Sequence, residues 1–125
     1  MIGNDTKHRF HSLQEREKEG EVSLPKVELH LHLDCSLSYG VVKKLDPSIT
    51  EAQYRHEFIA PAKCYDLVDF LKRAVKGYQL MQTKTALELV VDDLFMQLKA
   101  DNVLYAEIRF APFLHTEKGL TAYEA

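Results

Sequence analysis

The stretch from Val27 to Asp34 constrains the fold of this chain more than any other, because its side chains alternate strictly between apolar and polar. The apolar set is Val27, Leu29, Leu31 and Leu33, and the polar set is Glu28, His30, His32 and Asp34. A period of two is typical of a β-strand, whose successive side chains point to opposite faces. We therefore predict a strand over residues 27–34, with its apolar face against helices and its polar face towards an enclosed space.

The polar face of this strand carries two imidazoles, His30 and His32, two positions apart. Residues at that spacing lie roughly 6.5–7 Å apart on the same side of a strand, so both rings can turn towards one cation. Zinc accepts imidazole nitrogen at about 2.0–2.1 Å, and a neighbouring carboxylate can orient such a ring. Short motifs of this kind also occur by chance. Two ordinary hydrogen-bonded or surface histidines are the alternative, and spacing alone leaves both interpretations open.

Composition places the chain among ordinary globular proteins, with 125 residues, 46% hydrophobic and 28% charged. A formal charge of −3 gives no reason to expect nucleic acid or an anionic membrane as a partner, and no apolar run is long enough to span a bilayer. Cys35 and Cys64 match neither a metal site nor a disulfide framework. We expect a cytoplasmic protein, with residues 1–22 as a polar tail or short helix and residues 23–125 as the folded part.

Helical signals fill the middle of the chain. Ser38 and Thr50 can cap short helices that reach Lys44 and Ile59. A longer helix is predicted by an apolar stripe that is typical of core, although its first turn can instead line a ligand pocket: Leu67, Phe70, Leu71, Ala74, Val75, Tyr78 and Met81. A capping box at 85–88 predicts another helix, ended by Asp101-Asn102, with this buried stripe: Leu87, Val90, Val91, Leu94, Phe95 and Leu98.

A second strand is predicted over residues 103–110. Its apolar face is Leu104, Ala106, Ile108 and Phe110, and on the other face we expect Glu107 and Arg109 to form an ion pair. The order strand, helices, strand implies a parallel pair and α/β architecture, and the polar second faces suit the staves of a barrel. A capping box at 121–124 predicts one more helix. Two strands cannot close a barrel, since a (β/α)₈ barrel typically needs about 250 residues.

Residues 25–34, Pro-Lys-Val-Glu-Leu-His-Leu-His-Leu-Asp, closely resemble the opening strand of the adenosine deaminases, a family of metal-dependent hydrolases. Residues 67–71 and 102–112 resemble, in the same order and spacing, the helix over the substrate mouth and the second strand of that family. The resemblance covers about residues 24–125. It implies that the chain is the N-terminal part of a (β/α)₈ TIM barrel.

By this resemblance His30 and His32 are the first two ligands of Zn²⁺, and His32 and Asp34 contact a purine nucleoside. Leu67, Phe70 and Leu71 form an apolar wall around it. The implied reaction is hydrolytic deamination of adenosine and 2′-deoxyadenosine to the inosine product and ammonia. The general acid/base Glu, a catalytic His and the remaining ligands are expected beyond residue 125. No catalytic residue is therefore assigned in these 125 residues, and the remainder of the barrel is required.

The turn after Asp34 departs from the family, because Cys35 and Ser36 stand where glycine is usual. This leaves substrate preference open. Two alternatives also stay open at this point: another metallohydrolase with a His-x-His strand, such as a phosphoesterase, and a non-catalytic remnant that pairs its strand edges with another chain.

Overall fold

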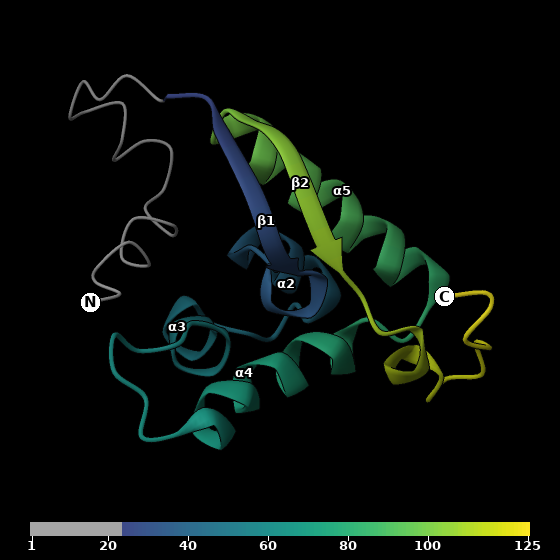
Figure 1. Ribbon diagram of the computed structural model, residues 1–125. Helices are drawn as coiled ribbons and strands as arrows, with labels where there is room; N and C mark the ends of the chain where they lie inside the picture. The colour runs from purple at the N-terminus through teal and green to yellow at the C-terminus, as the bar shows by residue number, and fades with distance from the viewer. Residues whose placement is uncertain (1–23) are drawn as a thin grey trace.

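Two parallel strands joined through four α-helices make up the fold (Figure 1). The structure is a computed structural model that describes residues 24–125, so the predicted tail at 1–22 lies outside the described residues. The elements are β1 (Lys26–His32), η2 (Leu33–Cys35), α2 (Tyr39–Leu45), α3 (Glu51–Phe58), α4 (Leu67–Leu80), α5 (Lys84–Ala100), β2 (Val103–Arg109) and η3 (Pro112–His115), of which η2 and η3 are 3₁₀-helices. The predicted parallel pair and the α/β class are confirmed.

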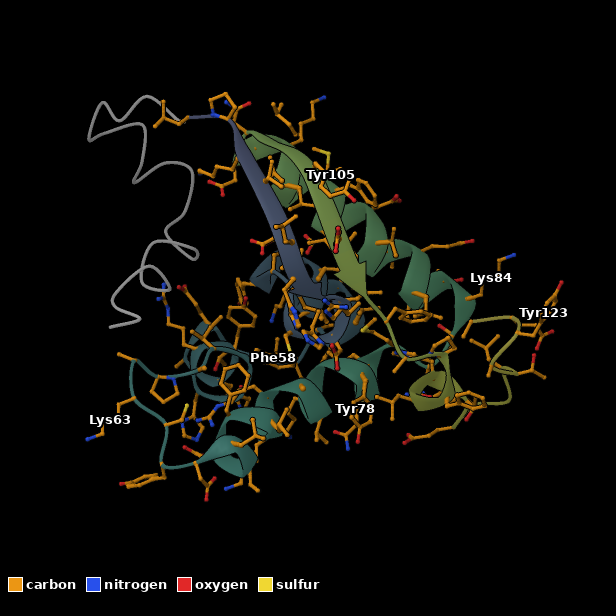
Figure 2. The ribbon with its side chains drawn as sticks, in the orientation of Figure 1. Phe58, Lys63, Tyr78, Lys84, Tyr105 and Tyr123 are labelled. Atoms are coloured by element: carbon orange, nitrogen blue, oxygen red, sulfur yellow. The ribbon has the colours of Figure 1, made fainter. Side chains whose placement is uncertain are left out.

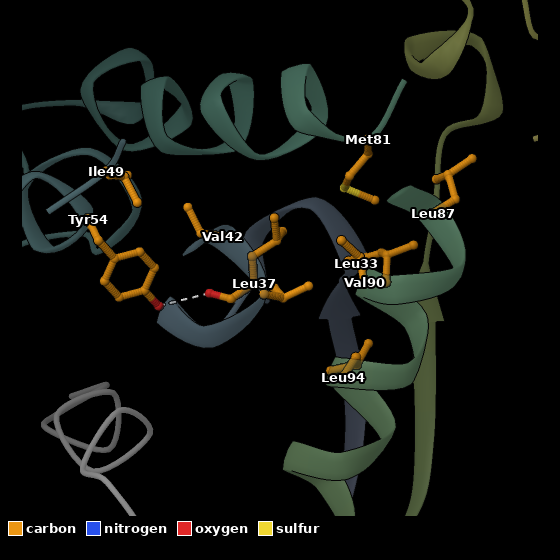
Figure 3. Close-up of a cluster of buried hydrophobic side chains, with 10 residues drawn as sticks. Leu33, Leu37, Val42, Ile49, Tyr54, Met81, Leu87, Val90 and Leu94 are labelled. Carbon is orange, nitrogen blue, oxygen red and sulfur yellow. Dashed lines mark hydrogen bonds between the residues drawn. The ribbon is translucent and has the colours of Figure 1, made fainter. Parts of the chain in front are cut away.

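The core lies between α5, α2 and the turn that follows β1, rather than evenly across the sheet (Figure 3). Leu33 and Leu37 from that turn pack with Val42 of α2, Met81, and three residues of α5, which are Leu87, Val90 and Leu94. The Tyr54 hydroxyl donates a hydrogen bond to the Leu37 carbonyl at 2.8 Å and so ties α3 to the same turn. The segment just after β1 is therefore surrounded by helices.

The first strand is shorter than predicted, because the chain leaves the extended conformation after His32. The Ser36 N–H donates to the Leu33 carbonyl at 3.2 Å, and the Ser36 hydroxyl donates to the His32 carbonyl at 2.5 Å. These bonds close a 3₁₀ turn over residues 33–35, which contains Asp34. The prediction that Asp34 lies on the strand is wrong.

The prediction that both strands turn a covered apolar face towards helices holds only near their carboxyl ends. Leu31 and Ile108 pack against the core, but Val27, Leu29 and Leu104 are 61%, 58% and 74% exposed. The reason is that the helices of the described chain cover only part of this sheet. The polar face is open as well, since His30 and His32 are exposed rather than enclosed.

The apolar stripes predicted for the two long helices are also only partly covered. Met81 is fully buried after the end of α4, whereas the stripe residues Leu67, Phe70, Leu71 and Val75 are exposed. Phe95 of α5 is exposed too, while Leu87, Val90 and Leu94 of the same stripe are buried as predicted. Helix periodicity therefore located the apolar face, but the packing of neighbours decided how much of it is covered.

Helix boundaries agree with the capping signals in most places. Ser38 caps α2, and Thr50 caps α3 in a reciprocal box with Gln53. Asn102 follows α5 with a φ of 54°, the left-handed conformation that asparagine tolerates. The box at 121–124 forms its hydrogen bonds, from Thr121 N–H to Glu124 Oε2 at 2.9 Å and from Glu124 N–H to Thr121 Oγ1 at 3.3 Å, but encloses only a turn.

The N-cap of α5 is Thr83 and not Thr85, which corrects the predicted start of this helix. The Thr83 side chain accepts a hydrogen bond from the Ala86 N–H at 3.2 Å. We expect Thr83→Ala to lower the free energy of unfolding by about 1 kcal/mol, the usual effect of losing such a cap. Thr85→Ala should leave stability unchanged or slightly raised, because alanine favours a helix interior. Urea denaturation of both variants tests this, and equal losses would contradict the assignment.

Candidate metal centre

His30 and His32 project from the polar face of β1 and bring their ring nitrogens together. Their Nε2 atoms are 3.0 Å apart, and the ring centroids are 5.0 Å apart. Two zinc–nitrogen bonds at a tetrahedral angle hold the nitrogens about 3.3–3.4 Å apart, given bond lengths of about 2.0–2.1 Å. The pair is thus within a few tenths of an ångström of that geometry. The donor set and its convergence fit a metal site, and the same 3.0 Å contact also fits a hydrogen bond between the two rings, which was the alternative interpretation.

Arg109 of β2 lies beside this pair, because His32 and Arg109 are partners in the strand register. Its Nε is 3.0 Å from His30 Nδ1 and 3.2 Å from His30 Nε2. A guanidinium N–H only donates, and a neutral imidazole has one nitrogen without a proton, so Arg109 and a metal ion compete for the same nitrogen of His30.

The predicted Glu107–Arg109 ion pair does not form in the described chain. Glu107 Oε1 instead accepts a hydrogen bond at 3.2 Å from the hydroxyl of Tyr105, which is labelled on β2 in Figure 2. Strand residues two apart share a face, but the approach of β1 gives Arg109 the ring of His30 as a nearer partner. The interpretation of the two residues as a structural pair is therefore wrong.

A pocket of about 250 Å³ opens where the two strands end. Its lining is His32, Asp34, Arg109, Phe110, Ala111, Leu114 and His115. Open α/β sheets and barrels bind ligands at the carboxyl ends of their strands, so the pocket lies where such a protein places its site. The structure brings His32 and Asp34 together here, although Asp34 reaches the pocket from the turn η2 and not from the strand.

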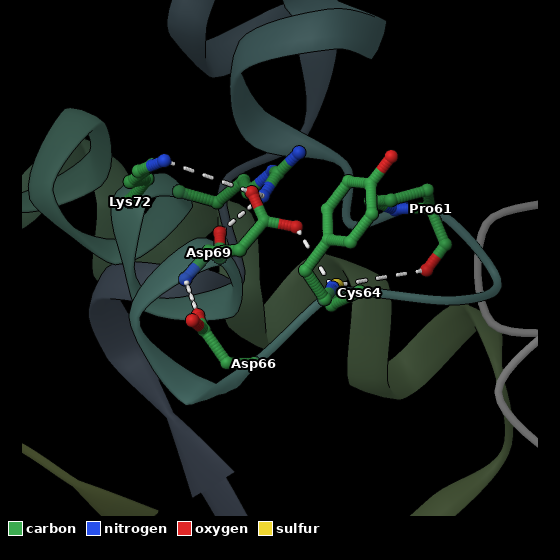
Figure 4. A network of polar contacts seen from close by, with 7 residues as sticks. Pro61, Cys64, Asp66, Asp69 and Lys72 are labelled. Atoms are coloured by element: carbon green, nitrogen blue, oxygen red, sulfur yellow. Dashed lines mark hydrogen bonds and ion pairs between the residues drawn. The ribbon is translucent and has the colours of Figure 1, made fainter.

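Leu67, Phe70 and Leu71 do not line that pocket. They lie on the first turns of α4, where all three are exposed. A polar network anchors this end of the helix (Figure 4): Asp66 Oδ1 accepts from the Asp69 N–H at 2.8 Å, and Asp69 Oδ2 accepts from the Tyr65 N–H at 3.3 Å. The Tyr65 N–H and then the Arg73 side chain lower the pKa of Asp69. The role of Leu67, Phe70 and Leu71 as an apolar wall for a ligand stays a prediction.

His115 is the pocket residue that sequence reasoning left without a role. It is only 1% exposed, with its Nδ1 2.8 Å from the Met81 carbonyl and its ring stacked on Phe110 at 4.9 Å. Gln82 holds the same segment, since its Nε2 donates to the Leu114 carbonyl at 2.8 Å. Pro112, at the start of η3, is a sequence signal from which a helical turn could have been predicted here.

Cys35 is exposed as a residue and is a free cysteine. Partial burial of its sulfur, followed by the charge of Asp34, raises the pKa of the thiol to about 11. Metals bind the thiolate, so a thiol that keeps its proton is a poor ligand. Within residues 24–125, no three His, Cys, Asp or Glu side chains form a group that could hold a metal ion.

Two parallel strands joined through helices, with polar side chains gathered at their carboxyl ends, define an α/β protein that offers a ligand site at that edge of its sheet. The chain belongs to the adenosine deaminase family, whose model matches residues 25–125.

Curated relatives agree with this assignment. The adenosine deaminase of Streptococcus agalactiae is 45% identical over 106 residues, which cover 79% of this chain and 31% of the relative. Those of Clostridium perfringens and Enterococcus faecalis are 38% and 41% identical, and the matches cover 33% and 31% of them. The chain thus spans about a third of the length of these relatives. No solved structure matches significantly. No helix within residues 24–125 is both long and apolar enough to cross a bilayer.

Proposed function

We propose that the protein carrying this chain, with the remainder of its barrel present, hydrolyses adenosine and 2′-deoxyadenosine to the inosine product and ammonia. Membership of the adenosine deaminase family supports this, as does the convergence of the His30 and His32 Nε2 atoms at 3.0 Å. That convergence carries the proposal, because it places two metal-type donors next to a pocket. A cytoplasmic location remains a prediction from cysteine usage.

His30 and His32 would hold a zinc ion, and Asp34 would orient the nucleoside from the pocket that it shares with His32. Zinc at such a site lowers the pKa of a water molecule to about 7 and supplies a nucleophile at neutral pH. Leu67, Phe70 and Leu71 would contact the purine and exclude water from it. Their apolar side chains are exposed on the first turns of α4 and so are available for such a contact. The groups that move protons are expected beyond residue 125.

The experiment is an assay of the complete protein from its source beside the isolated 125-residue chain. We expect zinc in the complete protein, together with loss of adenosine absorbance and release of ammonia. The isolated chain should bind zinc weakly and release no ammonia, because two ligands are fewer than the three that catalytic zinc usually has. Hydrolysis of phosphoesters without deamination would overturn the proposal, as would robust turnover by the isolated chain or a complete protein without zinc or activity.

A further inference from the structure

The turn that carries Asp34 is held by two polar side chains of α5, far away in the sequence. The Ser38 N–H and hydroxyl donate to the two carboxylate oxygens of Asp93, at 3.0 Å and 2.6 Å. Gln97 Nε2 donates to the Ser36 carbonyl at 2.7 Å and to Asp93 Oδ2 at 2.8 Å. Residues 36 and 38 are therefore both bonded to one face of α5.

These contacts reach the candidate metal centre in one further step. The Ser36 hydroxyl donates to the carbonyl of His32, at 2.5 Å. Ser36 thus connects α5, through its carbonyl, to the backbone of one proposed zinc ligand, through its hydroxyl. Asp34 lies between His32 and Ser36 in the chain, so its position depends on the bond that joins these two residues.

The opposite side of the turn is held by packing. An ideal Cβ on Gly77 of α4 would lie 1.8 Å from the Asp34 carbonyl oxygen, which shows how closely the two backbones approach. The turn is therefore clamped between a backbone contact on α4 and a polar network on α5. Asp93 is half-buried, and among the described residues its carboxylate accepts hydrogen bonds from neutral groups only. Each of these bonds is charge-assisted, because the acceptor is an ionised carboxylate.

We propose that Asp93 and Gln97 are positioning residues that fix the turn at 33–38 and so set Asp34 relative to His32. This inference rests on the proposed function for the role of Asp34 in binding nucleoside, but not for the clamp itself. Asp93→Asn keeps the size of the side chain but replaces an acceptor by a donor that faces the donors of Ser38 or Gln97. Gln97→Met keeps the length of the side chain and removes its amide, whose Nε2 makes both of the bonds described above.

The test compares Asp93→Asn and Gln97→Met in the complete protein with Asp92→Asn, a change of the same kind at the neighbouring exposed position of α5. Amide hydrogen exchange is the first measurement. We expect the Ser38 amide in Asp93→Asn to exchange about tenfold faster or more, as for the loss of one hydrogen bond to a charged group. Gln97→Met should act in the same direction with a smaller effect, and Asp92→Asn should match the parent protein.

Steady-state kinetics and zinc content are the second measurement. A displaced Asp34 should raise KM for adenosine about tenfold or more, because the protein then loses one charge-assisted hydrogen bond to the nucleoside. The kcat and the amount of bound zinc should stay unchanged. Unchanged exchange at Ser38 in both variants would overturn the clamp. Faster exchange with unchanged KM would overturn its link to Asp34, and an equal effect of Asp92→Asn would overturn its specificity. A parent protein without deaminase activity would refute the proposed function alone, since exchange still decides the clamp.

Discussion

Gly77→Ala is expected to lower the free energy of unfolding by about 1–3 kcal/mol, the range typical of overpacking. In most helix interiors this substitution is favourable by roughly 0.5–1 kcal/mol, because glycine loses more backbone freedom on folding. Here the added Cβ would meet the Asp34 carbonyl oxygen at 1.8 Å and its carbon at 2.9 Å. Both atoms are backbone, so α4 itself must move away from the turn η2.

Gly40→Ala is the matched control, because an ideal Cβ on Gly40 of α2 meets only the Ser38 Oγ, at an ordinary 3.5 Å. It should leave stability unchanged or raise it by up to about 1 kcal/mol. Chemical denaturation gives both values. Stabilisation by Gly77→Ala would show that α4 and the turn do not approach as closely as described.

His32→Ala is expected to weaken zinc binding to the complete protein by more than a hundredfold and to abolish deamination. Loss of a residue that only orients a ligand usually costs ten- to hundredfold in metal affinity, so loss of a ligand should cost more. The Nε2 atoms of His32 and His30 lie 3.0 Å apart, and a single imidazole cannot replace the pair. His30→Ala should have the same effect on zinc.

Chelator competition measures the zinc affinity directly, without relying on turnover. The control is His56→Ala, because His56 is exposed on α3 and lies outside the candidate metal centre. All three substitutions remove exposed side chains, so the stability of the metal-free protein should change by no more than about 0.5 kcal/mol. Full zinc affinity in His32→Ala would contradict the assignment of this histidine as a ligand.

Local chemistry made much of the fold predictable. Alternation over 27–34 and 103–110 predicted both strands, which end at His32 and Arg109 in the structure, and the intervening helices predicted their parallel order. Side chains that bond to their own backbone, such as Ser38 and Thr50, marked helix starts correctly. The prediction of a capping box at Thr85 was wrong, because Thr83 and Thr85 are both followed by residues that suit a helix and only the folded backbone shows which hydroxyl meets an N–H.

The sequence by itself determined which residues could act as ligands: His30 and His32 share a face because a strand repeats every two residues. Only the tertiary structure decided what surrounds them. Arg109 beside His30, Asp34 on a turn, and His115 in the same pocket depend on contacts between segments far apart in the chain. Periodicity describes one element at a time, whereas burial and hydrogen bonding depend on which other elements pack against it.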